Sequence, residues 1–396
     1  MTHGDSSGVQ YCTSCSSYFG TILACSINLS DVAHAILKQD NVDVNVKDSD
    51  GNTALSWACI NDCISDVALE ILKQDNVDVH VKDQGGGTPL IHACRESLSD
   101  VALEILKRDN VDVNAKDRNG VTALYWACKD CLSDVALEIL KRDNVDVNAK
   151  DKYGMTALFF ASQDSLSDVV RDLLQHEKVD VNTRLHDGRT SLYIASQEGH
   201  IDIVRALLQH DNVDVNLPEN TGETALMSAC LQGHVEIARA LLQHNTVDVN
   251  AKVQGGRTAF FWACCEGHRD VIREFLSCER VDPNVKGALG NTALIWACLR
   301  DDVNVVRELL ECDRVDANLR NKAGSTALDI ARKCQVFEIT RCLEEHVEAC
   351  RRRKRAPCQA STAAQLETTC IARGIHRNYH KSTNNSCGRG AWWSVD

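Results

Sequence analysis

The chain has 396 residues, of which 44% are hydrophobic and 25% are charged, a composition typical of folded chains and not of disordered ones. Its 43 Lys and Arg stand against 56 Asp and Glu, and the net charge of −13 argues against a nucleic-acid-binding protein, because phosphate contacts need clustered cations. Twenty cysteines would suit a secreted disulfide scaffold. Residues 1–20, however, lack the positive segment of a secretory signal, and no apolar run approaches the roughly 18 residues of a membrane span. We therefore expect a cytoplasmic protein with free thiols and no contact with a membrane.

The first 13 residues show no repeated pattern and are predicted to be flexible, whereas residues 14–345 repeat themselves about every 34 residues. The tetrapeptide Val-Asp-x-Asn occurs nine times, with His80 in place of Asn once. It starts at Val42, Val77, Val111, Val145, Val179, Val213, Val247, Val281 and Val315. A degenerate copy at residues 24–31 adds a first unit, so the sequence predicts about ten repeats, with the first and last as caps.

Each repeat contains the signals of a turn, two short helices and an extended arm, as residues 117–151 show. Residues 117–120, Asp-Arg-Asn-Gly, form a turn signal in which glycine can take a positive φ. Thr122 is placed to cap a first helix, and Ser133 and Asp134 are placed to cap a second one. The apolar stripe predicted for the second helix consists of Val135, Leu137, Ile139 and Leu140.

This pattern resembles the ankyrin repeat, which is matched most fully by residues 189–204 with their Thr-Ser-Leu, Gly-His and Ile-Val. The resemblance implies an all-α solenoid of stacked helix-turn-helix units joined by β-hairpin-like loops. One departure is that the family's His after Leu is absent from all nine copies. In the family this His makes hydrogen bonds between repeats, so we expect packing to replace polar bridging along this row. The row reads Ser56, Ile91, Tyr125, Phe159, Tyr193, Met227, Phe261, Ile295 and Asp329.

The same resemblance points to a partner-binding surface. In the family, partners usually contact the hairpin tips and the concave side of the first helix. Here the residues at the matching positions differ between copies, whereas the recurring residues around them, which form the frame of the repeat, stay the same. That is how a binding surface on a scaffold would look, although surface residues also drift without selection. The candidate tip residues are Arg118, Asn119, Lys152, Tyr153, His186, Asp187 and Asn220. The candidate helix-end residues are Lys129, Gln163, Asp164, Gln197, Glu198 and Gln232. The aromatic row at Tyr125 and Phe159 is more typical of a core, although aromatic residues also favour interfaces.

Cysteine and histidine patterns do not predict a metal site. Six cysteines share one small-residue position of the first helix, where a free thiol packs as a small apolar group: Cys59, Cys94, Cys128, Cys230, Cys264 and Cys298. Cys12 and Cys15 have no second pair at a zinc-ribbon distance, and Cys264, Cys265 and His268 lack a fourth ligand. An exposed Cys265 would remain a candidate for redox sensing.

The recurrence of most polar residues also argues against an enzyme, because an active site needs unlike groups in one asymmetric cluster. We expect a monomeric, non-enzymatic scaffold that binds protein partners of unknown identity, with no cofactor, no small-molecule substrate and no direct contact with nucleic acid. The alternatives are an adaptor that delivers a client to a modifying complex such as a ubiquitin ligase, or a nuclear regulatory protein that uses its tail. An adaptor would need a second recruiting motif, and no F-box-like or SOCS-box-like segment stands outside the repeats.

The tail at residues 346–396 differs from the body, with nine Lys and Arg against three Asp and Glu, and is predicted to be disordered. Its cluster Arg351, Arg352, Arg353, Lys354 and Arg355 is a candidate nuclear-import signal, a contact for an acidic partner or a solubilising segment. The resemblance further implies candidate sites for asparaginyl hydroxylation at Asn45, Asn114 and Asn148.

Overall fold

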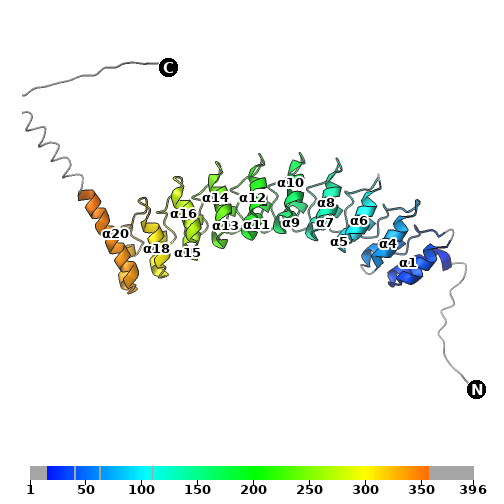
Figure 1. Cartoon of the computed structure of the whole chain (residues 1–396), viewed down its shortest axis with the longest axis horizontal. Helices are drawn as coiled ribbons and strands as arrows, with labels where there is room; N and C mark the ends of the chain where they lie inside the picture. The colour runs from blue at the N-terminus through cyan, green and yellow to red at the C-terminus, as the bar shows by residue number, and fades with distance from the viewer. Residues whose placement is uncertain (1–15, 40–41, 62–63, 109, 356–396) are drawn as a thin grey trace, which may run out of the picture. The chain divides into compact units, whose positions relative to one another are not determined.

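The computed structural model describes residues 16–355 except for 40–41, 62–63 and 109. Residues 1–13, Cys12 among them, Cys15 and the tail from residue 356 lie outside the described residues, so the predictions made for them are not addressed. The described part contains twenty helices and no strand, which confirms the all-α prediction. The chain divides into two compact units, residues 1–340 and 341–396, and of the second the structure describes residues 341–355, which are helical (Figure 1).

Helices alternate between two kinds along the chain. The first helices of successive repeats are α1 (Ser16–Ser26), α3 (Ala54–Ile60), α5 (Pro89–Arg95), α7 (Ala123–Lys129), α9 (Ala157–Gln163), α11 (Ser191–Glu198), α13 (Ala225–Gln232), α15 (Ala259–Glu266), α17 (Ala293–Leu299) and α19 (Ala327–Lys333). The second helices are α2 (Ser30–Leu37), α4 (Ser65–Leu72), α6 (Ser99–Leu106), α8 (Ser133–Leu140), α10 (Ser167–Gln175), α12 (Ile201–Leu208), α14 (Val235–Gln243), α16 (Arg269–Ser277), α18 (Val303–Leu310) and α20 (Phe337–Arg355).

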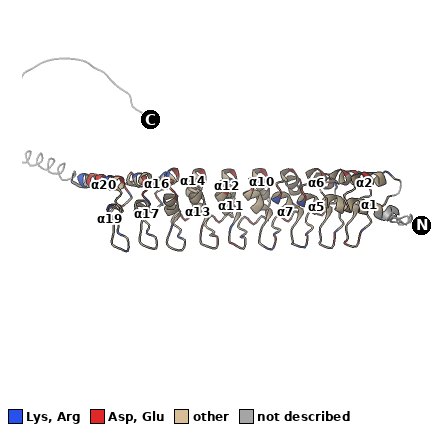
Figure 2. Ribbon diagram, turned by 90° about the horizontal axis from the view of Figure 1, so that it is seen from below, with Lys and Arg blue, Asp and Glu red and all other residues tan. Residues whose placement is uncertain are grey.

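The first unit consists of two helical layers. First helices pack on first helices of the neighbouring repeats, and second helices from α2 to α18 do the same in the other layer. The loops between repeats project beyond the first-helix layer in a single row (Figure 2). Each helix buries an apolar face that it could not bury alone, so the stacking of neighbours supplies the core.

Local sequence explains the turn and the start of each first helix. In the turn before α7, Asp117 Oδ1 accepts from the backbone N–H of Asn119 at 2.8 Å, and Gly120 takes a φ of +80°. Thr122 then caps α7, because its hydroxyl accepts from the N–H of Tyr125 at 3.4 Å. The same threonine cap begins every first helix from α3 to α19, which confirms the predicted cap.

The predicted cap of the second helix is wrong. Helix α8 begins at Ser133 itself, and the N-cap residue Leu132 makes no side-chain bond, while Asp134 lies in the first turn of the helix. The backbone closes this turn instead: Cys131 is left-handed with a φ of +59°, and the N–H of Leu132 bonds to the carbonyl of Ala127 at 2.7 Å. This bond satisfies a carbonyl at the C-terminal end of α7, and at the start of α8 the N–H of Ser133 bonds to the carbonyl of Cys131 at 3.0 Å.

Packing within α8 also differs from the predicted stripe in one position. Leu137 is half-buried, and Ala136 takes its place on the buried face. Residues four apart lie on the same face of a helix with 3.6 residues per turn, so the pairs 135 and 139, and 136 and 140, make up the buried face, and position 137 points away from it. The buried residues are Val135, Ala136, Ile139 and Leu140.

The aromatic row of the first helices is core, but it is not purely apolar. Tyr125 and Phe159 are 4% and 2% exposed, so they are not available as interface anchors. The hydroxyl of Tyr125 nevertheless donates to Asp151 of the next repeat at 3.1 Å, and that of Tyr193 donates to Glu223 at 3.4 Å. The expectation that packing replaces polar bridging is therefore wrong at these two tyrosines, because their hydroxyls reach the turn of the following repeat.

Asparagine side chains provide further bonds between repeats. Asn182 Nδ2 donates to the carbonyl of Asn212 at 2.7 Å, and Asn182 Oδ1 accepts from the N–H of Asp214 at 2.9 Å. We call the positions that repeat this pair of bonds the asparagine ladder: Asn45, Asn114, Asn148, Asn182, Asn216, Asn250 and Asn284. The ladder gives the recurring Val-Asp-x-Asn its structural role.

Candidate partner-binding surface

Loops project in a row from the first-helix layer (Figure 2). The predicted tip residues belong to these loops, and five of them form a continuous strip. Lys152 Nζ lies 4.9 Å from the centre of the Tyr153 ring, and that ring meets the His186 ring edge to face at 6.2 Å. Asn220 Nδ2 donates to the carbonyl of His186 at 2.9 Å, and the N–H of Asn220 donates to the carbonyl of Asp187 at 2.9 Å. We call these five residues the tip strip, and it joins three successive repeats.

The remaining tip residues, Arg118 and Asn119, are exposed but belong to an earlier loop. Asn119 Nδ2 contacts Asp117 of its own turn at 3.5 Å. Among the described residues, no hydrogen bond, ion pair or ring contact joins either of them to the tip strip.

The predicted helix-end residues lie at the other end of the first helices. They are Lys129, Gln163, Asp164, Gln197, Glu198 and Gln232. Helix α9 has seven residues, so about 10 Å separate its two ends at 1.5 Å per residue. Their side chains contact neighbours in the same repeat: Lys129 Nζ lies 4.5 Å from the centre of the Trp126 ring, and the Gln197 amide donates to Glu198 at 2.9 Å. The structure therefore does not bring the helix-end residues and the tip strip into contact.

Between the two sets lies a row of rings that sequence reasoning missed. Phe160 occupies the same register; the members with a ring nitrogen, which we call the ring row, are Trp57, His92, Trp126, Trp262 and Trp296. Each follows the capping threonine by four residues, and this register was the signal that could have revealed it. All but His92 are half-buried, as is typical of tryptophan, which combines a large apolar body with a polar N–H.

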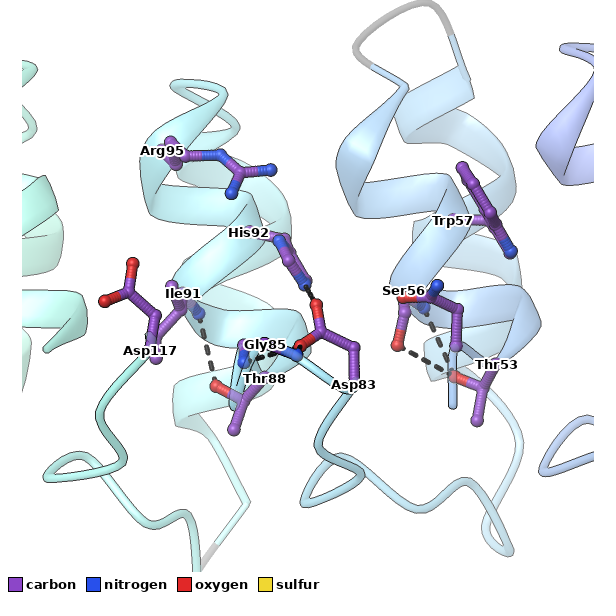
Figure 3. A network of polar contacts seen from close by, with 12 residues as sticks. Thr53, Ser56, Trp57, Asp83, Gly85, Thr88, Ile91, His92, Arg95 and Asp117 are labelled. Carbon is purple, nitrogen blue, oxygen red and sulfur yellow. Dashed lines mark hydrogen bonds and ion pairs between the residues drawn. The ribbon is translucent and has the colours of Figure 1, made fainter. Parts of the chain in front are cut away.

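The ring row is bonded to the turns at its N-terminal members. Trp57 Nε1 donates to Asp48 Oδ2 at 2.7 Å, and His92 Nε2 lies 2.9 Å from Asp83 Oδ2. Figure 3 shows Asp83 reaching from the turn to the His92 ring while its other oxygen accepts from the N–H of Gly85. Burial and, to a lesser degree, the neighbouring Arg95 lower the pKa of His92, which keeps the ring neutral at neutral pH.

The thiols that the sequence singled out, Cys265 and those of the small-residue position, are buried. Cys265 is 7% exposed, and burial raises its pKa to about 12, so it is not the exposed thiol that redox sensing would need. Cys298 and its equivalents are buried, and desolvation likewise raises the pKa of the Cys298 thiol to about 12. Within residues 16–355, apart from the gaps given above, no cluster of three or more His, Cys, Asp or Glu could hold a metal ion. No helix in this described part is long and apolar enough to cross a membrane.

The candidate modification and import sites occupy two different settings. The candidate hydroxylation sites Asn45, Asn114 and Asn148 belong to the asparagine ladder, where the amides of all three are bonded to the next repeat. In the basic cluster, Arg352 Nη2 lies 3.3 Å from Glu348 on the same helix. These positions test neither the predicted hydroxylation nor the predicted nuclear import.

Comparison with known proteins agrees with the geometry. The family of ankyrin repeats, in a sequence model of three copies, matches residues 65–151, 134–219, 212–287 and 260–353. These matches begin at residue 65, so the count of about ten repeats, which includes earlier units, stays a prediction. No curated protein matches the chain significantly. The matches cover well over half of the chain, and together with the stacked helix pairs they show that it belongs to the ankyrin-repeat family.

Proposed function

We propose that this protein is a non-enzymatic scaffold that binds partner proteins through the hairpin tips and the concave face of the repeat array, from the tip strip to the helix-end residues. Ankyrin repeats are generally protein–protein interaction modules, and the family is typically non-enzymatic. The observation that carries the proposal is a division between recurring and varying residues. The recurring threonines, turn aspartates and ladder asparagines are all bonded within the frame. The varying residues of the tip strip are exposed and contact one another.

Such a frame favours binding because it holds the varying side chains in place before a partner arrives. Ordering loops and side chains at an interface is one of the main entropic costs of association. Tyr153, which is 50% exposed, has its position defined by contacts with Lys152 and His186. Aromatic residues presented in this way are favoured as interface anchors.

The experiment is a comparison of captured proteins for three forms of the full chain, read out by mass spectrometry. The test variant carries Tyr153→Ala, Gln163→Ala and Gln197→Ala. The control variant carries alanine at exposed lysines of the other layer: Lys73, Lys107 and Lys141. We expect the wild type and the control to capture the same proteins and the test variant to lose them. Equal capture by all three forms would show that this surface is not the binding site.

We further propose that the protein is a cytoplasmic monomer without cofactor, nucleic-acid or small-molecule substrate, and that the basic cluster at 351–355 can direct it to the nucleus. Clusters of five basic residues are a common feature of import signals. A fluorescent fusion of the full chain should lose its nuclear fraction when the cluster is replaced by glutamine. An unchanged distribution would leave the cluster as a solubilising segment.

A further inference from the structure

A pocket of about 300 Å³ opens on the first-helix layer between α15 and α17 and the loops that precede them. Its walls include the rings of Phe261, Trp262 and Trp296, and the Phe261 and Trp296 rings pack 5.6 Å apart. On its rim, Leu289 is 68% exposed, which is unusual for a large apolar side chain. Neither the tip strip nor the helix-end residues contribute to this pocket.

The two indoles in the pocket differ from the N-terminal members of the ring row in lacking a turn carboxylate. The residue equivalent to Asp48 and Asp83 is Val253 in the repeat of Trp262 and Gly287 in the repeat of Trp296. The turn backbone is nevertheless retained: the N–H of Val253 bonds to the carbonyl of Arg257, and that of Gly287 bonds to the carbonyl of Asn291, each at 3.0 Å. The loops therefore keep their shape and lose only the acceptor.

As a result, both indole N–H groups are left without a partner. Trp262 Nε1 and Trp296 Nε1 are buried and have no hydrogen-bond acceptor within the described residues. A buried donor without an acceptor is unfavourable and is rare in folded proteins. Trp126 Nε1 is a third unpartnered indole, but Asp117 keeps a carboxylate in its turn. Only at Trp262 and Trp296 has the repeat lost the group that could satisfy the ring.

The space for an acceptor is present beside Gly287. A Cβ placed on Gly287 would have its nearest neighbour, the carbonyl oxygen of Gly255, at an ordinary contact distance of 3.6 Å. In the repeat of Trp57 the carboxylate from this turn position reaches the indole at 2.7 Å. The corresponding volume in the repeat of Trp296 is part of the pocket, which Gly287 lines.

The charges around the pocket favour an acidic ligand. The Arg257 guanidinium lies 4.3 Å from the centre of the Trp262 ring, and within the described residues it forms no ion pair. Arg300 and Glu266 also line the pocket, and both of them line an adjoining hollow together with Asp301. Arg257 is therefore the cation best placed to meet a ligand carboxylate.

We propose that this pocket binds a linear segment of a partner protein, in which an acidic side chain supplies the carboxylate that Val253 and Gly287 cannot. The acid takes the place beside Gly287, next to the unpartnered Trp296 indole and in the pocket that Arg257 also lines, and an adjacent apolar side chain of the segment packs on Trp296 and Leu289. The proposal rests on the proposed scaffold function and specifies one ligand class for it.

Random linear peptides displayed on phage are the probe, selected against the full chain. Selected peptides are then measured against wild type, Gly287→Asp and Arg257→Gln. Gly287→Asp restores the carboxylate within the repeat and should leave the unfolding transition unchanged or raised, which circular dichroism checks. Asn144→Asp is the matched control, since it adds the same charge at an exposed position outside both the tip strip and the pocket.

We expect enriched peptides to carry an acidic residue beside an apolar one, with affinity reduced about tenfold or more by Gly287→Asp and by Arg257→Gln and unchanged by Asn144→Asp. The proposal is overturned if no peptide is enriched, if the enriched peptides lack acids, or if they bind wild type and both pocket variants equally. Should Gly287→Asp fail to fold, Arg257→Gln alone decides. A further outcome is that Gly287→Asp captures the same proteins as wild type while the variant with alanine at Tyr153, Gln163 and Gln197 loses them. That result would refute the proposal for the pocket and leave the proposed scaffold function standing.

Discussion

The asparagine ladder allows the coupling between repeats to be measured, because the chain contains a matched position outside it. Asn182 bonds to the carbonyl of Asn212 and to the N–H of Asp214 in the next repeat, at 2.7 and 2.9 Å. Asn318 occupies the same place in its tetrapeptide, but within the described residues its side chain bonds only to Asp316 Oδ1, at 3.3 Å. Alanine at position 182 therefore removes two bonds between repeats, whereas alanine at 318 removes none.

Each hydrogen bond of this kind contributes about 1 kcal/mol net to stability. Both bonds of Asn182 are solvent-exposed, so water can replace part of what is lost. We expect Asn182→Ala to lower the free energy of unfolding by about 1–2 kcal/mol and Asn318→Ala by about 0.5 kcal/mol or less. The converse change should stabilise: His80 makes no side-chain bond to the next repeat within the described residues, and His80→Asn should add about 1 kcal/mol.

Urea unfolding followed by circular dichroism, with hydrogen exchange to locate the change, is the appropriate assay. Long repeat arrays can unfold in more than one step, so the comparison uses the transition that contains the altered repeat. Equal losses for Asn182→Ala and Asn318→Ala would show that the ladder bonds do not couple the repeats and that the asparagines act only within their own tetrapeptides.

Two substitutions and one labelling experiment test the recurring contacts of the repeats. Ser165 has a left-handed φ of +62°, so Ser165→Gly should raise the free energy of unfolding by about 0.5–1 kcal/mol, and a loss in urea unfolding would contradict the strain argument. Burial lowers the pKa of His92 below its ordinary 6.5, so the unfolded state takes up the proton first and stability falls as the pH drops through 6.5 towards the folded pKa. His92→Trp, which can still donate to Asp83, should flatten this slope between pH 7.5 and 5.5, and an unchanged slope would assign it to other groups. With iodoacetamide at pH 8, peptide mapping should find Cys334, which is exposed, labelled well before Cys298, whose pKa burial raises to about 12, and similar rates would mean that α17 opens readily.

Periodicity was enough to predict the architecture, because residues close together in the sequence determine the turn and the first-helix cap of each repeat. Thr122 caps its helix through contacts within three residues, and such contacts depend little on the rest of the fold. The cap predicted at Ser133 failed for a different reason. The chain reverses there through a left-handed Cys131, a residue type that gives no signal of this conformation.

Contacts between repeats were harder to foresee, because they depend on which side chains the stacking brings together. That Tyr125 would reach Asp151 follows from the stagger of adjacent repeats, which sequence spacing does not specify. The ring row has a clear register in the sequence, four residues after the capping threonine. Whether each ring nitrogen has a hydrogen-bond partner, however, depends on the turn residue that faces the ring. The change from Asp48 to Gly287 is visible in the alignment of the repeats, but its meaning emerges only when the turn is seen to face the indole.

A partner of this protein can use only the groups that the frame leaves unbonded. Unbonded groups arise in two ways. Some are variable side chains on the tips, such as Tyr153. Others lose their hydrogen-bond partner because the turn lacks its aspartate, as at Val253 and Gly287. A tip ring such as Tyr153 presents an exposed apolar surface that partners of different sequence can contact, whereas a buried indole donor of the pocket would select a ligand that places an acceptor beside it. Binding through the tips should therefore be broad and binding through the pocket selective, so exchanging Asp for Asn in a bound segment should cost far more affinity at the pocket than at the tip strip.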